Sequence, residues 1–358
     1  MPYVSIYRMR RLIMVAVLAW GSASAAYADE WTIPVNHVID GRNMPAQWSP
    51  LPTGKITKRW KLCVLFPHLK DPYWMAGDYG IVQEVLRDNL NMQLFHAEGY
   101  EHLDQQLAQM SDCIDQRYDA IILGAIHSDK VAPLVRKAVE KGIPVIDFVN
   151  GVNEPQVSAH ALVSFYDLAF QTAQYIVKRF DKDQPKIGFF PGLPGSNWSD
   201  DAVRGFNDGL KGSNARIVVT TRVDTGLSRQ LAAINDALKA YPDMNFIVGV
   251  DIAAQAAATA VRTAHKSDSI KILAFDMIPG VHQDIMNGVS EASPADFPVM
   301  QARMAVDMAV RLLEKQTLPA KKAGPVPQMF TKESAAKFSW NTMFAPRDFK
   351  EVYTVKAR

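Results

Sequence analysis

Residues 60–80 read WKLCVLFPHLKDPYWMAGDYG, and this stretch joins a short apolar run to a loop rich in polar and aromatic side chains. The run over 62–66 has the length and composition of a strand buried in a parallel sheet. The loop after it carries Asp71, Tyr73 and Trp74 in front of a segment that we expect to be helical. Ligands of open parallel sheets lie beyond the carboxyl ends of the strands. The stretch therefore predicts a strand followed by one wall of a small-molecule site.

Apolar runs of strand length alternate with amphipathic segments of helical period over most of the chain. This alternation predicts parallel sheets with right-handed crossovers. The run over 186–191 has the same character as 61–67, which suggests a second lobe built on the same plan. We therefore predict an α/β fold of two lobes, two Rossmann-like parallel sheets joined by a hinge, with a ligand held between them. Further strands are expected at 92–96, 120–123, 144–149, 216–220, 246–250 and 271–275.

The length of 358 residues favours two domains. Four prolines and weak periodicity between residues 29 and 57 indicate an irregular segment there. Residues 296–322 are expected to return to the first lobe, and 323–358 to form a tail on the second. The full assignment is a signal peptide at 1–28, an N-terminal arm at 29–57, a first lobe at 58–160 and a second lobe at 161–295.

The N-terminus has the features of an export signal. An arginine-rich start precedes an apolar run over 12–20, and residues 26–28 read Ala-Tyr-Ala, the form of a signal-peptidase site. We expect cleavage after Ala28 and a mature protein in the periplasm. A start at Met9 is an alternative that leaves the signal intact. No later run reaches eighteen apolar residues, so we predict a protein that is not embedded in a membrane.

The chain has two cysteines, Cys63 and Cys113. Both belong to the exported part, and an oxidising compartment favours a disulfide. Cys63 lies near the start of the first predicted strand. Cys113 lies near the end of a helix expected to run antiparallel over that strand, so both reach the same edge of the sheet. We predict a disulfide, with two separate buried thiols as the alternative.

Composition and motifs exclude several classes of function. The 39 Lys and Arg nearly balance the 37 Asp and Glu, and no long basic run follows the signal, so nothing indicates a nucleic-acid partner. No nucleophile elbow, P-loop, zincin motif or Cys-based metal spacing occurs. We therefore predict a binding protein for a small molecule rather than an enzyme, without a metal or a cofactor.

Aromatic and carboxylate side chains follow several of the predicted strands. Aromatic faces can enclose a quaternary or methylated nitrogen, each contributing about 0.5–2 kcal/mol when desolvated. The aromatic rings could equally roof the core, and the carboxylates could cap helices. Trp198 is expected in a loop over 192–199, and Pro279 and Gly280 favour a loop after Asp276, which argues against a cap there. The candidate ligand-binding residues are Asp71, Tyr73, Trp74, His127, Asn150, Phe165, Trp198, Asp251 and Asp276.

Several segments resemble the TorT family of periplasmic trimethylamine N-oxide sensors. The resemblance implies a type I periplasmic binding fold that binds trimethylamine N-oxide. It also implies a partner, the periplasmic domain of a TorS-like sensor histidine kinase that controls expression of the respiratory trimethylamine N-oxide reductase. On this resemblance Asp71, Tyr73 and Trp74 belong to the ligand-binding loop. The segments are 60–74, 79–80, Cys113, 118–124, 143–146, 149–150 and 154–157, within a thinner likeness over 31–350.

Two positions depart from the family pattern. Phe165 stands where a tryptophan is expected, and Asp276 stands where a tyrosine is expected. An ionised Asp276 has no proton to donate to an N-oxide, although it could face a positive nitrogen. Another methylamine or a sugar-like solute is therefore an alternative ligand. The alternative function is the solute-binding subunit of a sugar-type ABC importer.

Overall fold

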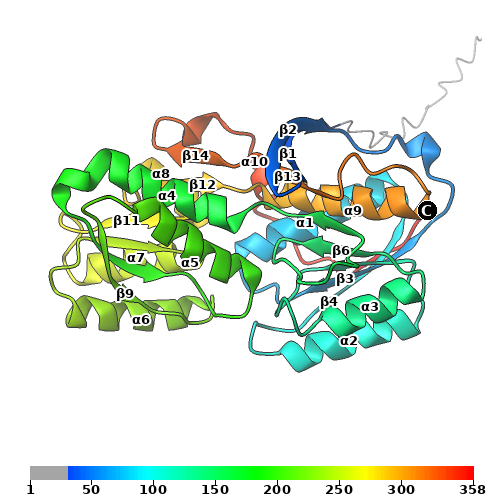
Figure 1. Ribbon diagram of the computed structural model, residues 1–358, viewed down its shortest axis with the longest axis horizontal. Coiled ribbons are helices and arrows are strands. Elements are labelled where there is room, and N and C mark those ends of the chain that lie inside the picture. Colours follow the sequence, from blue (N-terminus) through cyan, green and yellow to red (C-terminus); the bar gives the residue numbers. More distant parts are fainter. Residues whose placement is uncertain (1–30) are drawn as a thin grey trace, which may run out of the picture.

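Two parallel-stranded sheets lie side by side in the computed structural model, which describes residues 31–358 (Figure 1). Each sheet forms one lobe with the helices packed on it. This arrangement confirms the predicted two-lobed α/β fold. The predicted signal peptide falls outside the described residues. Among residues 31–358, every helix is too short or too polar to cross a bilayer.

The first lobe is built on a nine-stranded sheet in the order β15-β4-β3-β5-β6-β7-β13-β1-β2. Strands from β4 to β13 in this order run parallel to their neighbours, whereas β1, β2 and β15 are antiparallel. The bounds are β1 (Ile33–Ile39), β2 (Arg42–Trp48), β3 (Lys61–Phe66), β4 (Asn91–His96), β5 (Ala120–Leu123), β6 (Val145–Phe148), β7 (Ala159–Ala161), β13 (Lys322–Pro325) and β15 (Thr354–Val355).

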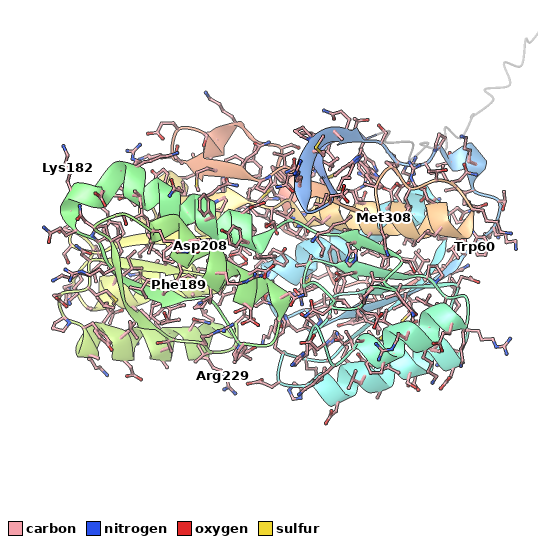
Figure 2. All side chains as sticks on the ribbon, viewed as in Figure 1. Trp60, Lys182, Phe189, Asp208, Arg229 and Met308 are labelled. Carbon is pink, nitrogen blue, oxygen red and sulfur yellow. A yellow bond between two sulfur atoms is a disulfide. The ribbon has the colours of Figure 1, made fainter. Side chains whose placement is uncertain are left out.

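The second lobe is built on a six-stranded sheet in the order β14-β12-β11-β10-β8-β9. Its strands are parallel except for β14, which runs antiparallel to β12. Phe189 on β8 stacks on Phe206 with ring centroids 4.4 Å apart in the interior of this lobe (Figure 2). The bounds are β8 (Lys186–Phe190), β9 (Arg216–Thr220), β10 (Phe246–Gly249), β11 (Lys271–Ala274), β12 (Ala292–Ala295) and β14 (Gln328–Thr331).

The crossover helices pack on the faces of the two sheets. In the first lobe α1 packs against α9, and α2 against α3; in the second, α4 packs against α5, and α6 against α7. The bounds are α1 (Pro72–Arg87), α2 (Leu103–Asp115), α3 (Ala132–Glu140), α4 (Phe165–Phe180), α5 (Asn197–Leu210), α6 (Leu227–Ala240), α7 (Asp251–Thr263), α8 (Pro279–Asn287), α9 (Pro298–Leu313) and α10 (Trp340–Met343). Single turns of 3₁₀ helix lie at Thr53–Lys55, Asp181–Asp183 and Ala335–Lys337.

Strand β3 is apolar on both faces because it is covered from both sides. Leu62, Val64 and Phe66 belong to the core that contains α1 and α9. Cys63 and Leu65 belong to a second core that contains residues of α2 and α3. Successive side chains of a strand point to opposite faces, so a continuous apolar run is what a doubly covered strand requires.

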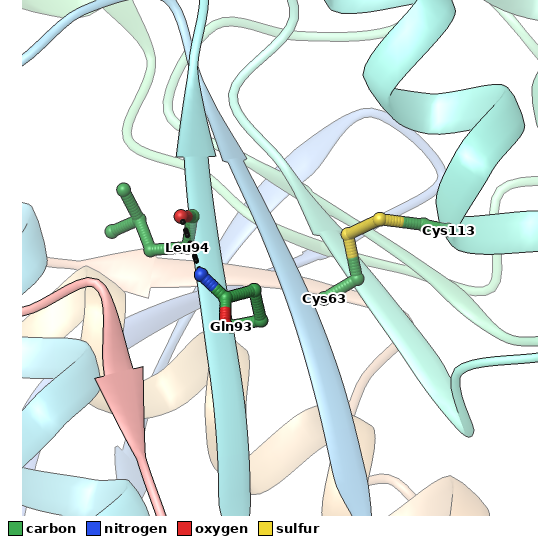
Figure 3. The surroundings of a disulfide bond; sticks show 4 residues. All are labelled: Cys63, Gln93, Leu94 and Cys113. Carbon is green, nitrogen blue, oxygen red and sulfur yellow. Dashed lines mark hydrogen bonds between the residues drawn. A yellow bond between two sulfur atoms is a disulfide. The ribbon is translucent and has the colours of Figure 1, made fainter. Parts of the chain in front are cut away.

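The predicted disulfide is present. Cys63 of β3 is bonded to Cys113 of α2, with the two Cα atoms 6.2 Å apart (Figure 3). Both residues are fully buried in the core beneath α2 and α3. The bond therefore fastens the crossover helix α2 to β3, the strand that precedes the loop leading into α1.

Residues 33–48 form an antiparallel hairpin, so the predicted irregular arm is wrong for this part of the chain. Strand β1 joins the hairpin to the first sheet by pairing with β13. Pro45 lies in the edge strand β2 and Pro34 near the start of β1, positions that tolerate the missing N–H. At the hairpin's end the buried indole of Trp48 donates from Nε1 to Asp307 on α9, over 2.8 Å. Long-range pairing thus overrides the proline-rich composition.

The chain passes between the lobes after β7, after β12, between β13 and β14, and again between β14 and β15. Gln301 of α9 ties two of these crossings together. Its Oε1 accepts from the backbone N–H of Val163, over 3.1 Å, and its Nε2 donates to the carbonyl of Asp296, over 2.8 Å. Such crossings are where two-lobed proteins bend when they open and close.

The C-terminal segment differs from the prediction that 323–358 forms a tail on the second lobe. Strand β14 does join the second sheet, but β13 and β15 both pair within the first. The last strand, Thr354–Val355, lies antiparallel to β4. Upstream of it, the N–H of Val352 donates to Asp78 on α1 over 2.8 Å. The end of the chain therefore returns to the first lobe.

Candidate functional site

A cavity of about 30 Å³ lies between the two lobes, beyond the carboxyl ends of strands from both sheets. Eight of the nine candidate residues line it: Asp71, Tyr73, Trp74, Asn150, Phe165, Trp198, Asp251 and Asp276. Parallel strands bring their carboxyl ends to one edge of a sheet, and the lobes face each other across these edges. Side chains spread over two hundred residues of sequence therefore meet in one place.

His127 is the candidate that the structure places outside the cavity lining. Its Nδ1 accepts from the N–H of Asp129 over 3.3 Å, and its ring lies against Gly195 of the other lobe. The loop after β5 here turns towards the second lobe, where the carbonyl of Ile126 accepts from Ser196 over 2.6 Å. The position after a strand led to the prediction, but the direction of this loop takes the imidazole away from the ligand space.

Four further residues line the cavity that sequence reasoning missed: Tyr100, Val149, Thr225 and Val250. Val149 and Val250 directly follow β6 and β10, and the other two lie a few residues beyond β4 and β9. The same strand-end rule that selected Trp74 could therefore have selected all four. The two valines carry no polar group to attract notice, and the other two sit too far along their loops for sequence to fix their direction.

Aromatic rings form walls of the cavity from both lobes. Trp74 and Tyr100 come from the first lobe, and Phe165 and Trp198 from the helices α4 and α5 of the second. The ring centroid of Trp198 lies 5.9 Å from that of Tyr100 and 5.8 Å from that of Phe165, so the rings touch across the lobe boundary. Helix α5 begins at Asn197, which puts Trp198 in its first turn rather than in the predicted loop.

Gly124, directly after β5, leaves the space that the indole of Trp74 occupies. A Cβ at this position would come within 2.5 Å of Cη2 of Trp74, which is closer than any real contact. The indole also packs on Phe66 of β3, with ring centroids 4.8 Å apart. The position of Trp74 is thus fixed by a strand on one side and by a missing side chain on the other.

Three carboxylates of the cavity each use one oxygen to cap a helix. Asp71 is the N-cap of α1, and its Oδ1 accepts from the N–H of Trp74 over 3.1 Å. Asp276 Oδ1 accepts from the N–H of Asp251, the first residue of α7, over 2.8 Å, and Asp251 Oδ1 accepts from the N–H of Ile252 over 2.5 Å. Capping and cavity lining are therefore compatible, because each carboxylate has a second oxygen.

The prediction of a loop at Pro279 and Gly280, after Asp276, is wrong. Helix α8 begins at Pro279, a residue that suits the first position of a helix. The argument against a capping role for Asp276 considered only the helix that follows it in sequence. In the structure Asp276 caps α7, the helix of the neighbouring strand-helix unit.

Burial is the main cause of the shifted acidities around the cavity. It raises the pKa of Asp251 and of Asp276 well above the usual value, and repulsion from neighbouring carboxylates, Asp71 for the first and Asp251 for the second, adds to it. Burial also raises the pKa of Asp296, next to the cavity, to about 6. These neighbouring carboxyls therefore resist ionising together at neutral pH.

A hydrogen-bonded chain links the cavity wall to the crossings between the lobes. The hydroxyl of Tyr73 donates to Asp296 Oδ2 over 2.5 Å, and Gln301 Nε2 donates to the same oxygen over 3.1 Å. Asp296 lies directly after β12, where the chain leaves the second lobe. Tyr73 is therefore hydrogen-bonded directly to the segment in which the chain crosses between the lobes after β12.

Contacts between the lobes hold the cavity closed. Lys70 Nζ lies 2.7 Å from Asp224 Oδ2, and the carboxylate of Asp224 is almost fully buried. The N–H groups of Asn197 and Trp198 donate across the boundary, to Ser128 Oγ over 2.8 Å and to the carbonyl of Asn150 over 3.2 Å. Among residues 31–358, no group of His, Cys, Asp and Glu side chains is arranged to hold a metal ion.

Several known proteins are similar to this chain in sequence or structure. A family model described as "Periplasmic binding protein domain" matches residues 62–317. Periplasmic protein TorT of Escherichia coli strain K12 is 28% identical over 299 residues, which cover 84% of this chain and 86% of that protein. A solved ABC transporter solute binding protein from Bradyrhizobium sp. BTAi1, with bound Bis-Tris, is 36% identical with a TM-score of 0.77. That match covers 90% of this chain and 98% of the other.

A solved complex of TorT with the TorS sensor domain, in the absence of ligand, is also similar in structure. The match is 24% identical with a TM-score of 0.73, and it covers 82% of this chain and 99% of the other. At this level of identity the likeness shows the fold alone.

Proposed function

Since the chain belongs to the periplasmic binding protein family, we propose that it is a periplasmic binding protein whose ligand is a small methylated amine, trimethylamine N-oxide or a related compound. The inter-lobe cavity carries this proposal, because aromatic faces from both lobes surround it and carboxylates complete it. A ring face attracts a positive nitrogen that carries methyl groups, and several desolvated faces add up to a few kcal/mol. The protein's role is binding and not catalysis.

The size of the cavity favours a methylamine over a sugar. A volume of about 30 Å³ corresponds to a few water-sized positions. Trimethylamine N-oxide has about five heavy atoms, half as many as a pentose, and so is the smaller of the two candidate ligands.

The proposed output is a signal. We infer that the closed, ligand-bound protein engages the periplasmic domain of a TorS-like sensor histidine kinase and thereby controls a respiratory trimethylamine N-oxide reductase. The likeness to TorT, over most of both chains, supports this partner. The 36% identity with an ABC transporter solute binding protein supports the second candidate, the binding subunit of an importer. Genes for a kinase and response regulator beside this one favour the sensor, and genes for a permease and ATPase favour the importer.

The ligand is tested by thermal unfolding of the mature, oxidised protein with trimethylamine N-oxide, trimethylamine, betaine and ribose. A ligand at 100 times its dissociation constant stabilises the protein by about 2.7 kcal/mol, which raises Tm by several degrees. We expect a methylamine to raise Tm and ribose to leave it unchanged. Trp74→Leu should abolish the shift, whereas Trp60→Leu, outside the cavity, should retain it. A shift with ribose alone would overturn the proposal.

A further inference from the structure

We propose that the ligand of the cavity is a cation, a small protonated or quaternary ammonium compound whose charge is met by Asp71, Asp251 and Asp276. This inference rests on the proposed function and narrows it, because trimethylamine N-oxide carries no net charge. It comes from the charge and the unused hydrogen-bonding groups of the lining, which the following observations describe.

Among residues 31–358, the side chains that line the cavity include three carboxylates and no cation. The nearby cation Lys70 is held by the buried carboxylate of Asp224 at 2.7 Å. His68 lies beside the cavity with its Nδ1 3.7 Å from Asp71 Oδ2, but burial lowers its pKa and so favours the neutral imidazole. The negative charge of the lining is therefore met by helix N-termini alone, which carry partial charges.

Each of the three carboxylates keeps one oxygen free for a ligand. The helix N–H groups bind Oδ1 of Asp71, Asp251 and Asp276. Asp251 is only 3% exposed, and its Oδ2 is buried without a hydrogen-bond partner among the described residues. A buried carboxylate oxygen without a partner is costly, and an ammonium group placed next to it removes that cost. This unpartnered oxygen points to a positively charged ligand independently of the aromatic walls.

The rival ligand class is the neutral N-oxide, and one group in the lining would suit it. The indole Nε1 of Trp198 is buried without a partner among the described residues and could donate to an oxide. The hydroxyl of Tyr73 donates to Asp296, and the hydroxyl of Tyr100 donates to Asn150 Oδ1 over 3.4 Å while it accepts from Asn150 Nδ2 over 3.0 Å. Among the described residues, Trp198 Nε1 is the lining's only buried donor without a partner, and it stands against three carboxylates, so the lining fits a cation, with Trp198 left to bind an oxygen elsewhere on the ligand.

The two ligand classes differ in whether their binding releases a proton from the protein. A cation next to Asp251 and Asp276 favours their ionised forms, so a carboxyl proton leaves to the solvent as the cation binds. An N-oxide needs a donor, so it favours a carboxyl that keeps its proton. The other titratable groups facing this pair are Asp71, Asp296 and Tyr73, and beyond Asp71 lie His68, Lys70 and Asp224. Release of one proton makes cation affinity rise by up to tenfold per pH unit.

The test is isothermal titration calorimetry of the full mature protein at pH 6, 7 and 8, in two buffers with different ionisation enthalpies. The probes are tetramethylammonium and trimethylamine N-oxide. At pH 8 we expect tetramethylammonium to bind at least tenfold more tightly than trimethylamine N-oxide. Its binding should release a proton, and its affinity should increase from pH 6 to pH 8. Tighter binding of the N-oxide without proton release would overturn this inference while leaving the proposed function intact. Ribose is titrated in parallel, and binding of ribose with no binding of either probe would overturn the proposed function.

Two substitutions test whether the carboxylate of Asp276 meets the positive charge of the ligand. Asp276→Asn keeps an oxygen to accept from the N–H of Asp251 and should lower tetramethylammonium affinity at least tenfold and remove the proton release. Asp167→Asn is the control for the loss of a carboxylate, since Asp167 lies in the first turn of α4 and outside the cavity, and it should bind as the wild type does. Unchanged binding by a folded Asp276→Asn protein would contradict the inference. The proton count of the wild type decides the question even where a variant unfolds.

Discussion

The Lys70–Asp224 ion pair joins the two lobes at the edge of the cavity, and we predict that Lys70→Met destabilises the closed form. Lys70 belongs to the loop after β3, and Asp224 to the loop after β9 in the other lobe. Methionine keeps most of the length and apolar stem of the lysine. The substitution therefore removes the charge and its hydrogen bond with little change in packing.

The expected size follows from the burial of Asp224. Its side chain is 3% exposed, Oδ1 has no partner among the described residues, and without Lys70 its Oδ2 keeps one weak bond, from the N–H of Gly226 over 3.2 Å. Leaving a buried charged group without its partner costs about 1–3 kcal/mol or more. Lys70 is 34% exposed, and solvent screens the pair, so we keep to this lower range. Opening hydrates Asp224, so the cost falls on the closed form alone.

Amide hydrogen exchange measures this opening without a ligand. The N–H groups of Ser128, Asn197 and Trp198 donate across the lobe boundary and become free when the lobes separate. A loss of about 1–3 kcal/mol lowers their protection roughly 5- to 150-fold. Amides inside β3 should keep their protection, because they exchange only when the lobe itself unfolds.

A second inter-lobe ion pair provides the control. Arg229 on α6, at the lower edge of the molecule in Figure 2, lies 2.8 Å from Glu101, and both side chains are exposed. An exposed pair contributes about 0–1 kcal/mol, so Arg229→Met should lower the same protection by less than about fivefold. Equal effects of the two substitutions, or no effect of Lys70→Met, would refute the reasoning that burial of Asp224 sets the strength of the contact.

Three predictions concern the stability of the fold. Breaking the Cys63–Cys113 disulfide, which spans 50 residues, should lower the unfolding free energy by up to about 4 kcal/mol in urea titrations with and without reductant. Gly205→Ala should cost about 2 kcal/mol or more by the same measurement, because its Cβ would lie 2.1 Å from the carbonyl oxygen of Tyr166 on α4. Asp78→Asn should be more stabilising, relative to the wild type, at pH 8 than at pH 5. Burial raises the pKa of Asp78 to about 7, so its contribution to stability is complete below about pH 4 and is lost as pH rises through 7.

Each of these has a measurement that separates it from a general loss of stability. Gly54→Ala serves as the control for the glycine substitution, because no atom lies within 4 Å of the added Cβ, and it should leave the unfolding free energy nearly unchanged. Reductant should have no effect on a protein in which both cysteines are already replaced. A constant difference between Asp78→Asn and wild type from pH 5 to pH 8 would show that this carboxyl does not titrate in that range.

Local pattern was enough to predict the two-lobed fold and most of the cavity lining. A run such as 62–66 is apolar at every position because helices cover both faces of its strand, and this composition is visible without coordinates. Trp74 and Asp276 could be named because parallel strands share the edge at which ligands bind. The disulfide could be predicted because a strand and its crossover helix have a known relative direction.

Only the tertiary structure decided how distant segments meet. The hairpin over 33–48 and the return of β15 to the first sheet depend on pairing with strands hundreds of residues away, which proline content and local period do not encode. His127 lies outside the cavity and Tyr100 lines it, contrary to the prediction, because packing across the lobes sets the direction of the loops that carry them. The sequence by itself determined which residue types stand at the ends of the strands. Three carboxylates and five aromatic rings share one cavity because the two lobes face each other, and that proximity exists only when both sheets are in place.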